Sequence, residues 1–528
     1  MTAIAPVQSI LGRCELARGA GVSAAVAAGL LGSLGCRGIE GGESGELLFA
    51  GPDGSLHGEI GWAGPVDLPL ADELSVQAAC GIMHVHGRRF GRPTALAVDY
   101  VSAVAGVLAA QGLLAGSLAR SRGSDVHSVR TSAAQAALLA VGQYLAAATA
   151  ADDWPEPDLP GGPPFTSADG TRFEIETLDP LAWQRFWAEL DTDRSAVARG
   201  WRPFQHRFAT ATCPLPAGLA EAIGRSDFSA VLTAGRNAGV SVLRVRESVD
   251  STAGTDRPPC RVTPLSGVRG PMPPVAGTAP LAGIRVVEAG RRVQGPLAGR
   301  MLGLLGADVL RIEPPGGDPL RGMPPMAGDC SARFLALNHG KRAIEIDLKS
   351  AAGRRSVLDL AAGSDVFLHN WAPGAAARLR LDANDVASAN PGIVYAWASG
   401  WGDEFGADPP LGTDYVVQAH SGLAALLDEQ APTPSLMTLT DVLGGLIAAF
   451  GVLAGLIGRQ HTGSGQRVDS SLLSAATVLT GLGRARPHGP LAVPVCTDLA
   501  ALATDPRFAR ALDRHGCWVI PGAPWEFQ

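Results

Sequence analysis

Lysine is nearly absent from this chain of 528 residues. Of its 43 lysine and arginine residues only two are lysines, Lys341 and Lys349, and they lie eight positions apart. The bias toward arginine is typical of a GC-rich genome rather than of a function. A flexible ammonium group can reach a phosphate as a point charge and is not equivalent to a planar guanidinium fork. Residues 338–349 are therefore a candidate phosphate-binding segment.

The sequence also has no excess of positive charge, no closely spaced cysteine pair and no recognisable signal-peptide pattern. The net charge of −7 excludes the basic surface that nucleic acid requires. Eight scattered cysteines with no CxxC pair argue against a zinc cluster or a disulfide framework and fit a reducing cytosol. The N-terminus shows no basic segment leading into an apolar core. We therefore expect a cytoplasmic protein without a signal peptide or a metal site.

Two stretches, residues 100–119 and 442–458, lack charges over most of the thickness of a bilayer. Both are rich in alanine and glycine, and Ser102 and Gln111 interrupt the first. They are predicted to be helices buried between protein layers, with no membrane partner.

The chain contains a degenerate internal repeat, sought first because repeats define domains. The pattern QAxxG stands at residues 77–81 and again at 418–422, and a weaker echo joins residues 15–40 to 288–313. A constant offset of 339 pairs residues 114–116 with 453–455, Arg120 with Arg459, and Ser102 with Asp441. Residues 313–402 have almost no counterpart in the first half, so residues 1–150 are predicted to be a partial copy.

The second half alternates short apolar strands with helices. Strands are predicted at residues 284–288, 307–313, 343–348, 365–368 and 393–397, and helices at 294–304 and 351–362. This pattern predicts an α/β fold, a parallel, Rossmann-like sheet with helices on both faces. Ligands bind beyond the carboxyl ends of the strands in such folds.

The remaining segments complete the domain plan. Residues 151–250 carry aromatic residues and a hairpin signal at Asp169-Gly170, which predict a small α+β domain. Residues 251–278 hold six prolines and are predicted to be a linker. The large domain is expected at 279–485, with residues 486–528 packing on it.

Asp441 begins the second apolar helix and is the first candidate for chemistry. The helix dipole should keep a carboxylate in the first turn ionised, and Gly444-Gly445 should leave open space beside it. Such a group suits attack on a thioester carbonyl. The alternative is an ordinary helix cap.

Asn370-Trp371, directly after a predicted strand, forms the second candidate. An indole can cover a flat ring such as adenine, and the alternative is a buried tryptophan in a turn. His84 and His86 lie two apart on a predicted loop and are expected to do no chemistry.

Five segments together resemble the family III coenzyme A (CoA) transferases, the group that includes formyl-CoA and carnitine-CoA transferases and the acyl-CoA racemases. These segments are residues 281–288, 306–318, 337–342, 370–374 and 459–466, and the match extends from about 280 to 480. The resemblance implies that CoA moves between carboxylic acids through a mixed anhydride and a thioester on Asp441. CoA is then a substrate carrier, and no cofactor is bound permanently. The CoA contacts implied by the resemblance are Val293, Gln294, Ile346, Asp347, Leu348, Lys349, Asn370, Trp371, Ala372 and Arg378.

Several positions depart from the family pattern. Pro314 stands where some members carry an arginine near the adenine, and Thr413 stands where the racemases carry a histidine base. Racemisation needs two bases to remove and return a proton, so transfer is favoured over an acyl-CoA racemase or isomerase. A CoA-binding scaffold without activity is a further alternative.

In the first half, Ser102 replaces the nucleophile, and the nearest carboxylate is Asp99, so this half is expected to be inactive. It is expected instead to supply the small domain to the second half. The protein is then expected to be either a homodimer or an intramolecular pseudo-dimer of its two halves. The partners are an acyl-CoA and a small carboxylic acid, neither of which the sequence names.

Overall fold

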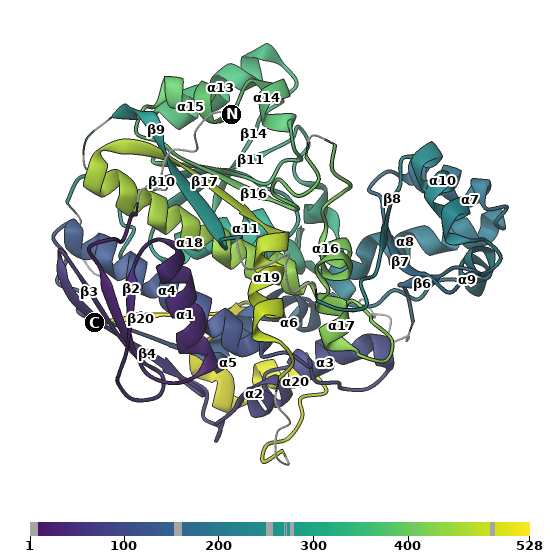
Figure 1. The fold of residues 1–528 in the computed structure, drawn as a ribbon, viewed down its shortest axis with the longest axis horizontal. Helices are drawn as coiled ribbons and strands as arrows, with labels where there is room; N and C mark the ends of the chain where they lie inside the picture. Colours follow the sequence, from purple (N-terminus) through teal and green to yellow (C-terminus); the bar gives the residue numbers. More distant parts are fainter. Residues whose placement is uncertain are drawn as a thin grey trace.

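The computed structural model describes residues 9–152, 161–249, 257–268, 270, 272–274, 279–406, 408–485 and 491–528 (Figure 1). Two large sheets with their helices form the main body, and a smaller unit extends from its side. Of the predicted linker, residues 251–256, 269, 271 and 275–278 lie outside the described residues. The domain boundaries expected at 250 and 486 lie outside them too.

The second half of the chain forms a seven-stranded sheet in the order β14-β11-β10-β15-β16-β17-β9. Six strands are parallel, and β9 runs antiparallel to β17 at one edge. The strands are β9 (Cys260–Val268), β10 (Arg285–Ala289), β11 (Asp308–Glu313), β14 (Arg342–Glu345), β15 (Val366–His369), β16 (Val394–Ser399) and β17 (Ser464–Ser471). A short hairpin, β12 (Met326–Ala327) and β13 (Cys330–Ser331), stands apart from this sheet.

Helices cover both faces of this sheet, which confirms the α/β class. The helices α13 (Ala351–Ala362) and α15 (Ala383–Ala389) cover one face, and α11 (Gln294–Leu304) and α18 (Leu439–Thr462) cover the other (Figure 1). The predicted helix at 351–362 is therefore confirmed, whereas the strand expected at 343–348 ends at Glu345. The other helices of this half are α12 (Ala332–Asn338), α14 (Ala375–Leu379), α16 (Asp414–Ser421), α17 (Leu423–Leu427) and α19 (Leu472–Leu482).

The predicted linker is wrong over Cys260–Val268, which is strand β9. Pro264 and Gly267 weaken any strand signal there. However, an edge strand tolerates proline because its outer N–H groups need no partner in the sheet. The chain thus crosses from the first half to the second as part of the sheet.

The first half forms a mixed six-stranded sheet in the order β2-β1-β3-β4-β5-β20. Its strands are β1 (Glu15–Arg18), β2 (Arg37–Glu40), β3 (Glu46–Gly51), β4 (Gly54–Gly61), β5 (Ser128–Ser132) and β20 (Glu526–Phe527). Its helices are α1 (Val22–Ser33), α2 (Glu73–Ala79), α3 (Ile82–Gly87), α4 (Tyr100–Ser121), α5 (Ala133–Ala140) and α6 (Gly142–Thr149). His84 and His86 lie on α3, so their placement on a loop is wrong.

The C-terminal segment joins the two halves instead of packing only on the large domain, which corrects the prediction for residues 486–528. Its last strand, β20, pairs with β5 of the first half. Before it come α20 (Leu499–Thr504) and the hairpin of β18 (Leu512–His515) and β19 (Trp518–Pro521). Trp518 packs against Ala146 of α6 and Ala336 of α12. Strand pairing over such a sequence separation leaves no local signal.

The two apolar stretches form α4 and α18, which pack against each other in the middle of the molecule. Both are long and apolar enough to cross a membrane, and 94% of the apolar window of each is buried inside the protein. The prediction of helices buried between protein layers is therefore confirmed.

The small unit contains the predicted hairpin around Asp169-Gly170. It consists of β6 (Phe165–Thr166), β7 (Arg172–Glu176), α7 (Pro180–Glu189), α8 (Arg194–Thr210), α9 (Ala217–Gly224), α10 (Phe228–Ala238) and β8 (Ser241–Arg244). The Trp183 ring packs edge-to-face against Trp187 at 5.3 Å and at a tilt against Phe204 at 4.6 Å, and these buried rings form the core of the unit.

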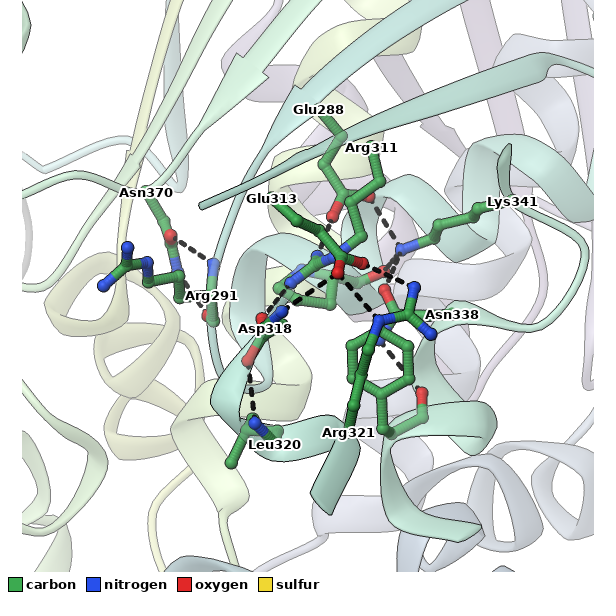
Figure 2. Close-up of polar contacts among 12 residues, drawn as sticks. Glu288, Arg291, Arg311, Glu313, Asp318, Leu320, Arg321, Asn338, Lys341 and Asn370 are labelled. Atoms are coloured by element: carbon green, nitrogen blue, oxygen red, sulfur yellow. Dashed lines mark hydrogen bonds and ion pairs between the residues drawn. The ribbon is translucent and has the colours of Figure 1, made fainter. Parts of the chain in front are cut away.

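Buried charges tie α11 to the sheet and to α12 (Figure 2). The Lys341 ammonium donates to Glu288 Oε2 at 2.7 Å, to the Pro296 carbonyl at 2.6 Å and to Asn338 Oδ1 at 2.9 Å. Arg311 donates to the other oxygen of Glu288 at 2.5 Å. Burial lowers the pKa of Lys341 to about 8. Lys341 is therefore a structural residue, and of the two lysines only the exposed Lys349 can meet a phosphate.

Gly299 makes this network fit, because a Cβ on it would lie 1.9 Å from Glu288 Oε2. We expect Gly299→Ala to lower the free energy of unfolding by about 3 kcal/mol or more, since it overpacks a buried ion pair. Gly303→Ala on the same helix meets only Val309, at 3.7 Å, and should be neutral or stabilise by about 0.5 kcal/mol. Urea unfolding of both variants tests this, and equal effects would contradict it.

Candidate active site

The order of the second sheet reverses between β10 and β15, because the chain proceeds from β10 toward β14 and then returns to β15. The loops that follow these two strands meet at this point. Asn370 Oδ1 accepts from the Arg291 N–H at 2.9 Å, and Asn370 Nδ2 donates to the Arg291 carbonyl at 2.9 Å (Figure 2). Ligands of doubly wound sheets bind in the crevice at such a switch point.

The predicted CoA contacts lie at the carboxyl edge of this sheet in two groups. Val293 and Gln294, at the start of α11, and Asn370 to Ala372, after β15, flank the switch point, with Arg378 exposed on α14 just beyond. Residues 346–349 follow β14, two strands away from β10. In this second group Ile346 is buried, Leu348 is half-buried, and Asp347 and Lys349 are exposed.

Trp371 was expected either to cover a flat ring such as adenine or to be a buried tryptophan in a turn, and it shows features of both. Its ring is half-buried and lies 4.5 Å from the His369 ring, while its carbonyl accepts from Trp397 Nε1 at 2.9 Å.

Asp441 is the third residue of α18 and does not cap it. Thr438 is the N-cap residue and makes no side-chain cap bond. Within the described part of the chain, the Asp441 carboxylate accepts no hydrogen bond. The residue is partly accessible to solvent, although buried residues surround it on α18. Its own backbone N–H donates to Asp414 Oδ2 at 2.7 Å.

Asp414 is a buried carboxylate that sequence reasoning missed. It also accepts from the Thr440 hydroxyl at 2.9 Å and from Gln418. The first half repeats this arrangement: Glu73 accepts from Gln77 at 2.9 Å and from the Ser102 N–H at 2.8 Å. An acidic residue four positions before the glutamine of each QAxxG pattern was the available signal.

Burial controls the charge of this pair. Desolvation, followed by the nearby Asp414 carboxylate, raises the pKa of Asp441 well above its usual range, and the Arg292 guanidinium opposes the rise. Burial raises the pKa of Asp414 to about 6, against the effect of its hydrogen bonds. The expectation that the helix dipole keeps Asp441 ionised is therefore wrong in direction, because burial outweighs the dipole.

Gly444 and Gly445 do not leave open space. A Cβ on Gly445 would lie 2.7 Å from the Gln294 carbonyl oxygen, and one on Gly444 would lie 2.9 Å from Leu472 and 3.2 Å from Gln294 Nε2. These glycines instead let α11 approach α18, which brings Gln294 within one helical turn of Asp441.

The small unit reaches this site from the first half. The Thr413 hydroxyl, beside Asp414, donates to Glu176 at the end of β7, and Glu176 pairs with Arg207 at 3.0 Å. Both charged side chains are buried. Neither Glu176 nor Arg207 carried a sequence signal, since only the tertiary fold brings them to Thr413.

A model of CoA-transferase family III matches residues 58–256 and 281–486. The chain belongs to this family. The resemblance noted from five segments is confirmed, and the two matches fit a chain in which two copies of the family sequence are fused.

Similar CoA transferases align with part of the chain. Succinyl-CoA:glutarate CoA-transferase of Mus musculus is 36% identical over 200 residues, 37% of this chain and 46% of that protein. The succinyl-CoA–L-malate CoA-transferase alpha subunit of Chloroflexus aurantiacus is 34% identical over 202 residues, 37% of this chain and 47% of that protein. A crystal structure of Rv3272 from Mycobacterium tuberculosis is 34% identical with a TM-score of 0.36, covering 38% of this chain and 57% of that one. The chain spans about half the length of the curated relatives it matches.

The raised pKa of Asp441 predicts a pH-dependent gain in stability for Asp441→Asn. Above about pH 4 the unfolded chain releases the Asp441 proton while the native protein retains it. Wild-type stability is thus lost as the pH rises through the native pKa. We expect the melting temperature of Asp441→Asn to exceed that of the wild type by about 1–3 °C at pH 8 and by less at pH 4.5. Asp359→Asn, an exposed site on α13, is the matched control and should show no such trend.

Proposed function

We propose that this protein transfers CoA from an acyl-CoA donor to a carboxylic acid through a covalent intermediate on Asp441. Family membership and the naming of its relatives as CoA transferases support the transfer. The observation that supports the covalent step is a carboxylate without a hydrogen-bond partner among the described residues, one helical turn from the switch-point crevice. Since two relatives are named for succinyl-CoA with glutarate or L-malate, dicarboxylic acids are the first substrates to test.

The proposed reaction runs in two halves. The Asp441 carboxylate attacks the acyl carbonyl, the C–S bond breaks, and a mixed anhydride and the CoA thiolate result. The thiolate then attacks the Asp441 carbonyl, which forms the aspartyl-CoA thioester and releases the donor acid as its carboxylate. The acceptor carboxylate repeats these steps in reverse and leaves as acyl-CoA, with Asp441 restored.

The two groups at the sheet edge have different roles in this proposal. Val293, Gln294 and residues 370–372 hold the part of CoA that enters the crevice, close to Asp441. The group at 346–349 lies further along the edge, where the exposed ammonium of Lys349 can meet a phosphate. Thr413 cannot act as a base, which favours transfer over racemisation.

The first half, in this proposal, is a scaffold. Ser102 stands at the position of Asp441, but its hydroxyl donates to Glu73 at 2.7 Å and is held inward. The first half contributes the small unit, whose Glu176 contacts Thr413, and the helix α4 that covers α18. It thereby forms an intramolecular pseudo-dimer with the second half.

Asp441→Asn should abolish transfer while it preserves the fold and CoA binding. Loss of a nucleophile commonly costs about 10³-fold or more in rate. Succinyl-CoA with glutarate is the first assay, and hydroxylamine added during turnover should convert residue 441 of the wild type to a hydroxamate detectable by peptide mass mapping. Asp99→Asn is the control and should retain activity. A hydroxamate at Asp99, or exchange of the α-proton without any acceptor acid, would contradict the proposal. CoA binding without transfer to any acid would favour the scaffold alternative.

Residues 257–528, which keep strand β9, should be poorly soluble and inactive when expressed alone, with activity returning when residues 1–249 are added. Separation exposes the face of α18 that α4 covers and removes the contact between Glu176 and Thr413. Water exclusion and substrate positioning, which are commonly worth several kcal/mol of barrier lowering, would be lost together. Full activity of the isolated fragment would show that the first half is an accessory.

A further inference from the structure

Arg292 adopts an unusual backbone conformation at the entrance to the candidate site. Its φ of 61° lies in the left-handed region, which a residue with a Cβ rarely occupies. The preceding residue, Arg291, is the one that bonds Asn370, and the following one, Val293, is the N-cap of α11. Such outliers persist where the surrounding structure holds them, and they cluster at ligand-binding sites.

The guanidinium of Arg292 has no anionic partner among the described residues. It is half-buried and lies over the ring of Phe208, 4.9 Å from its centroid, yet it forms no hydrogen bond or ion pair there. The buried Arg207 and Arg311 each pair with at least one carboxylate. A guanidinium whose flat face rests on an aromatic ring keeps its N–H edge free for a planar, bidentate acceptor.

Arg292 lies where three other helices meet. A small cavity is lined by Arg292 together with Gln143 from α6, Phe208 from α8 and Asn338 from α12. Its volume of about 10 Å³ is the room of a single water. The amide nitrogens of Gln143 and Asn338 already donate to protein acceptors. The two other arginines that line the cavity, Arg311 and Arg333, do so too, whereas the guanidinium of Arg292 donates no hydrogen bond among the described residues.

Arg292 also lies near Asp441. It precedes Gln294 by two residues, and a Cβ on Gly445, one helical turn from Asp441, would lie 2.7 Å from the Gln294 carbonyl oxygen. The Arg292 guanidinium also opposes the rise in the pKa of Asp441. A short substrate can therefore place one end at Asp441 and its other end at Arg292.

We propose that Arg292 binds the non-reacting carboxylate of a dicarboxylic substrate while the other end of that substrate reacts at Asp441. This inference rests on the proposed CoA transfer and names its substrate class. Arg292 is then the residue that selects dicarboxylic over monocarboxylic acids, and Phe208 of the first half holds it in place.

The test compares two acceptors of equal chain length, glutarate and pentanoate, with succinyl-CoA as donor. In a two-step exchange, kcat/KM for the acceptor reports only the second half of the reaction, so damage to donor binding does not enter. Arg292→Gln should lower kcat/KM for glutarate by about 10- to 100-fold, the usual effect of losing a charge-assisted pair, and for pentanoate by less than about threefold. Arg292→Lys, which keeps the charge without the fork, should give an intermediate loss.

Arg291→Gln is the matched control, because that neighbouring side chain is exposed and its bonds to Asn370 are made by the backbone. It should leave the glutarate-to-pentanoate ratio unchanged. Equal losses for both acids in Arg292→Gln, or the same change of ratio in Arg291→Gln, would overturn the inference. If Arg292→Gln does not fold, judged by circular dichroism, the ratio measured with Arg292→Lys decides.

Equilibrium dialysis of radiolabelled glutarate separates this inference from the proposed function. Weaker binding to Arg292→Gln than to the wild type and Arg291→Gln supports the carboxylate site even if no CoA is transferred. Unchanged binding overturns it even if transfer occurs. Failure of the wild type to transfer CoA to any acid overturns the proposed function alone.

Discussion

The close packing of α18 is the constraint on which the rest of the structure depends. Its glycines face neighbours that leave no room for a side chain. A Cβ on Gly445 would lie 2.7 Å from the Gln294 carbonyl oxygen, and one on Gly451 would lie 2.6 Å from Val468. In α4 the same contacts recur, at Gly106 against the Ser23 carbonyl oxygen and at Gly112 against Val129. Each sheet can therefore approach its long apolar helix closely, and the two helices pack against each other between the sheets. Asp441 is one turn before Gly445, so this packing also sets its distance from the crevice.

A buried pair of carboxylates is costly, and the structure distributes that cost unevenly. Asp414 is surrounded by donors from Thr440, Gln418 and the Asp441 backbone, which stabilise its ionised form. Asp441 has no donor among the described residues, and the positive charge that opposes the rise in its pKa is Arg292. A carboxylate without hydrogen bonds is less stable when ionised, and for the same reason its lone pairs remain available for attack on a carbonyl. Active sites commonly trade stability for reactivity in this way.

Local patterns predicted what local physics determines. Strands β10, β11, β14, β15 and β16 of the second sheet, α13 and the burial of α4 and α18 follow from apolar periodicity and length, whereas β17 was not predicted. Strand β9 escaped because Pro264 is tolerated only at an edge, and β20 escaped because its partner β5 lies nearly four hundred residues away. The position of Asp441 was readable, but its ionisation was not, since burial depends on the tertiary fold. Glu176 and Phe208 reach the site only because the small unit folds back onto the second half.

The two halves differ in whether the side chain at the equivalent helix position, Ser102 or Asp441, donates a hydrogen bond to the neighbouring buried carboxylate. Glu73 accepts from the backbone N–H and from the hydroxyl of Ser102, so the first half closes its polar groups upon themselves. Asp414 accepts from the backbone N–H of Asp441 in the same way, but among the described residues the Asp441 side chain donates no hydrogen bond to it. Its side chain is therefore excluded from the arrangement that holds Ser102 inward. The same kind of helix start thus has its side chain hydrogen-bonded in the first half and, among the residues that the structure describes, leaves the carboxylate of Asp441 without a hydrogen bond in the second. That carboxylate lies beside the sheet that carries the loops at 290–293 and 370–372.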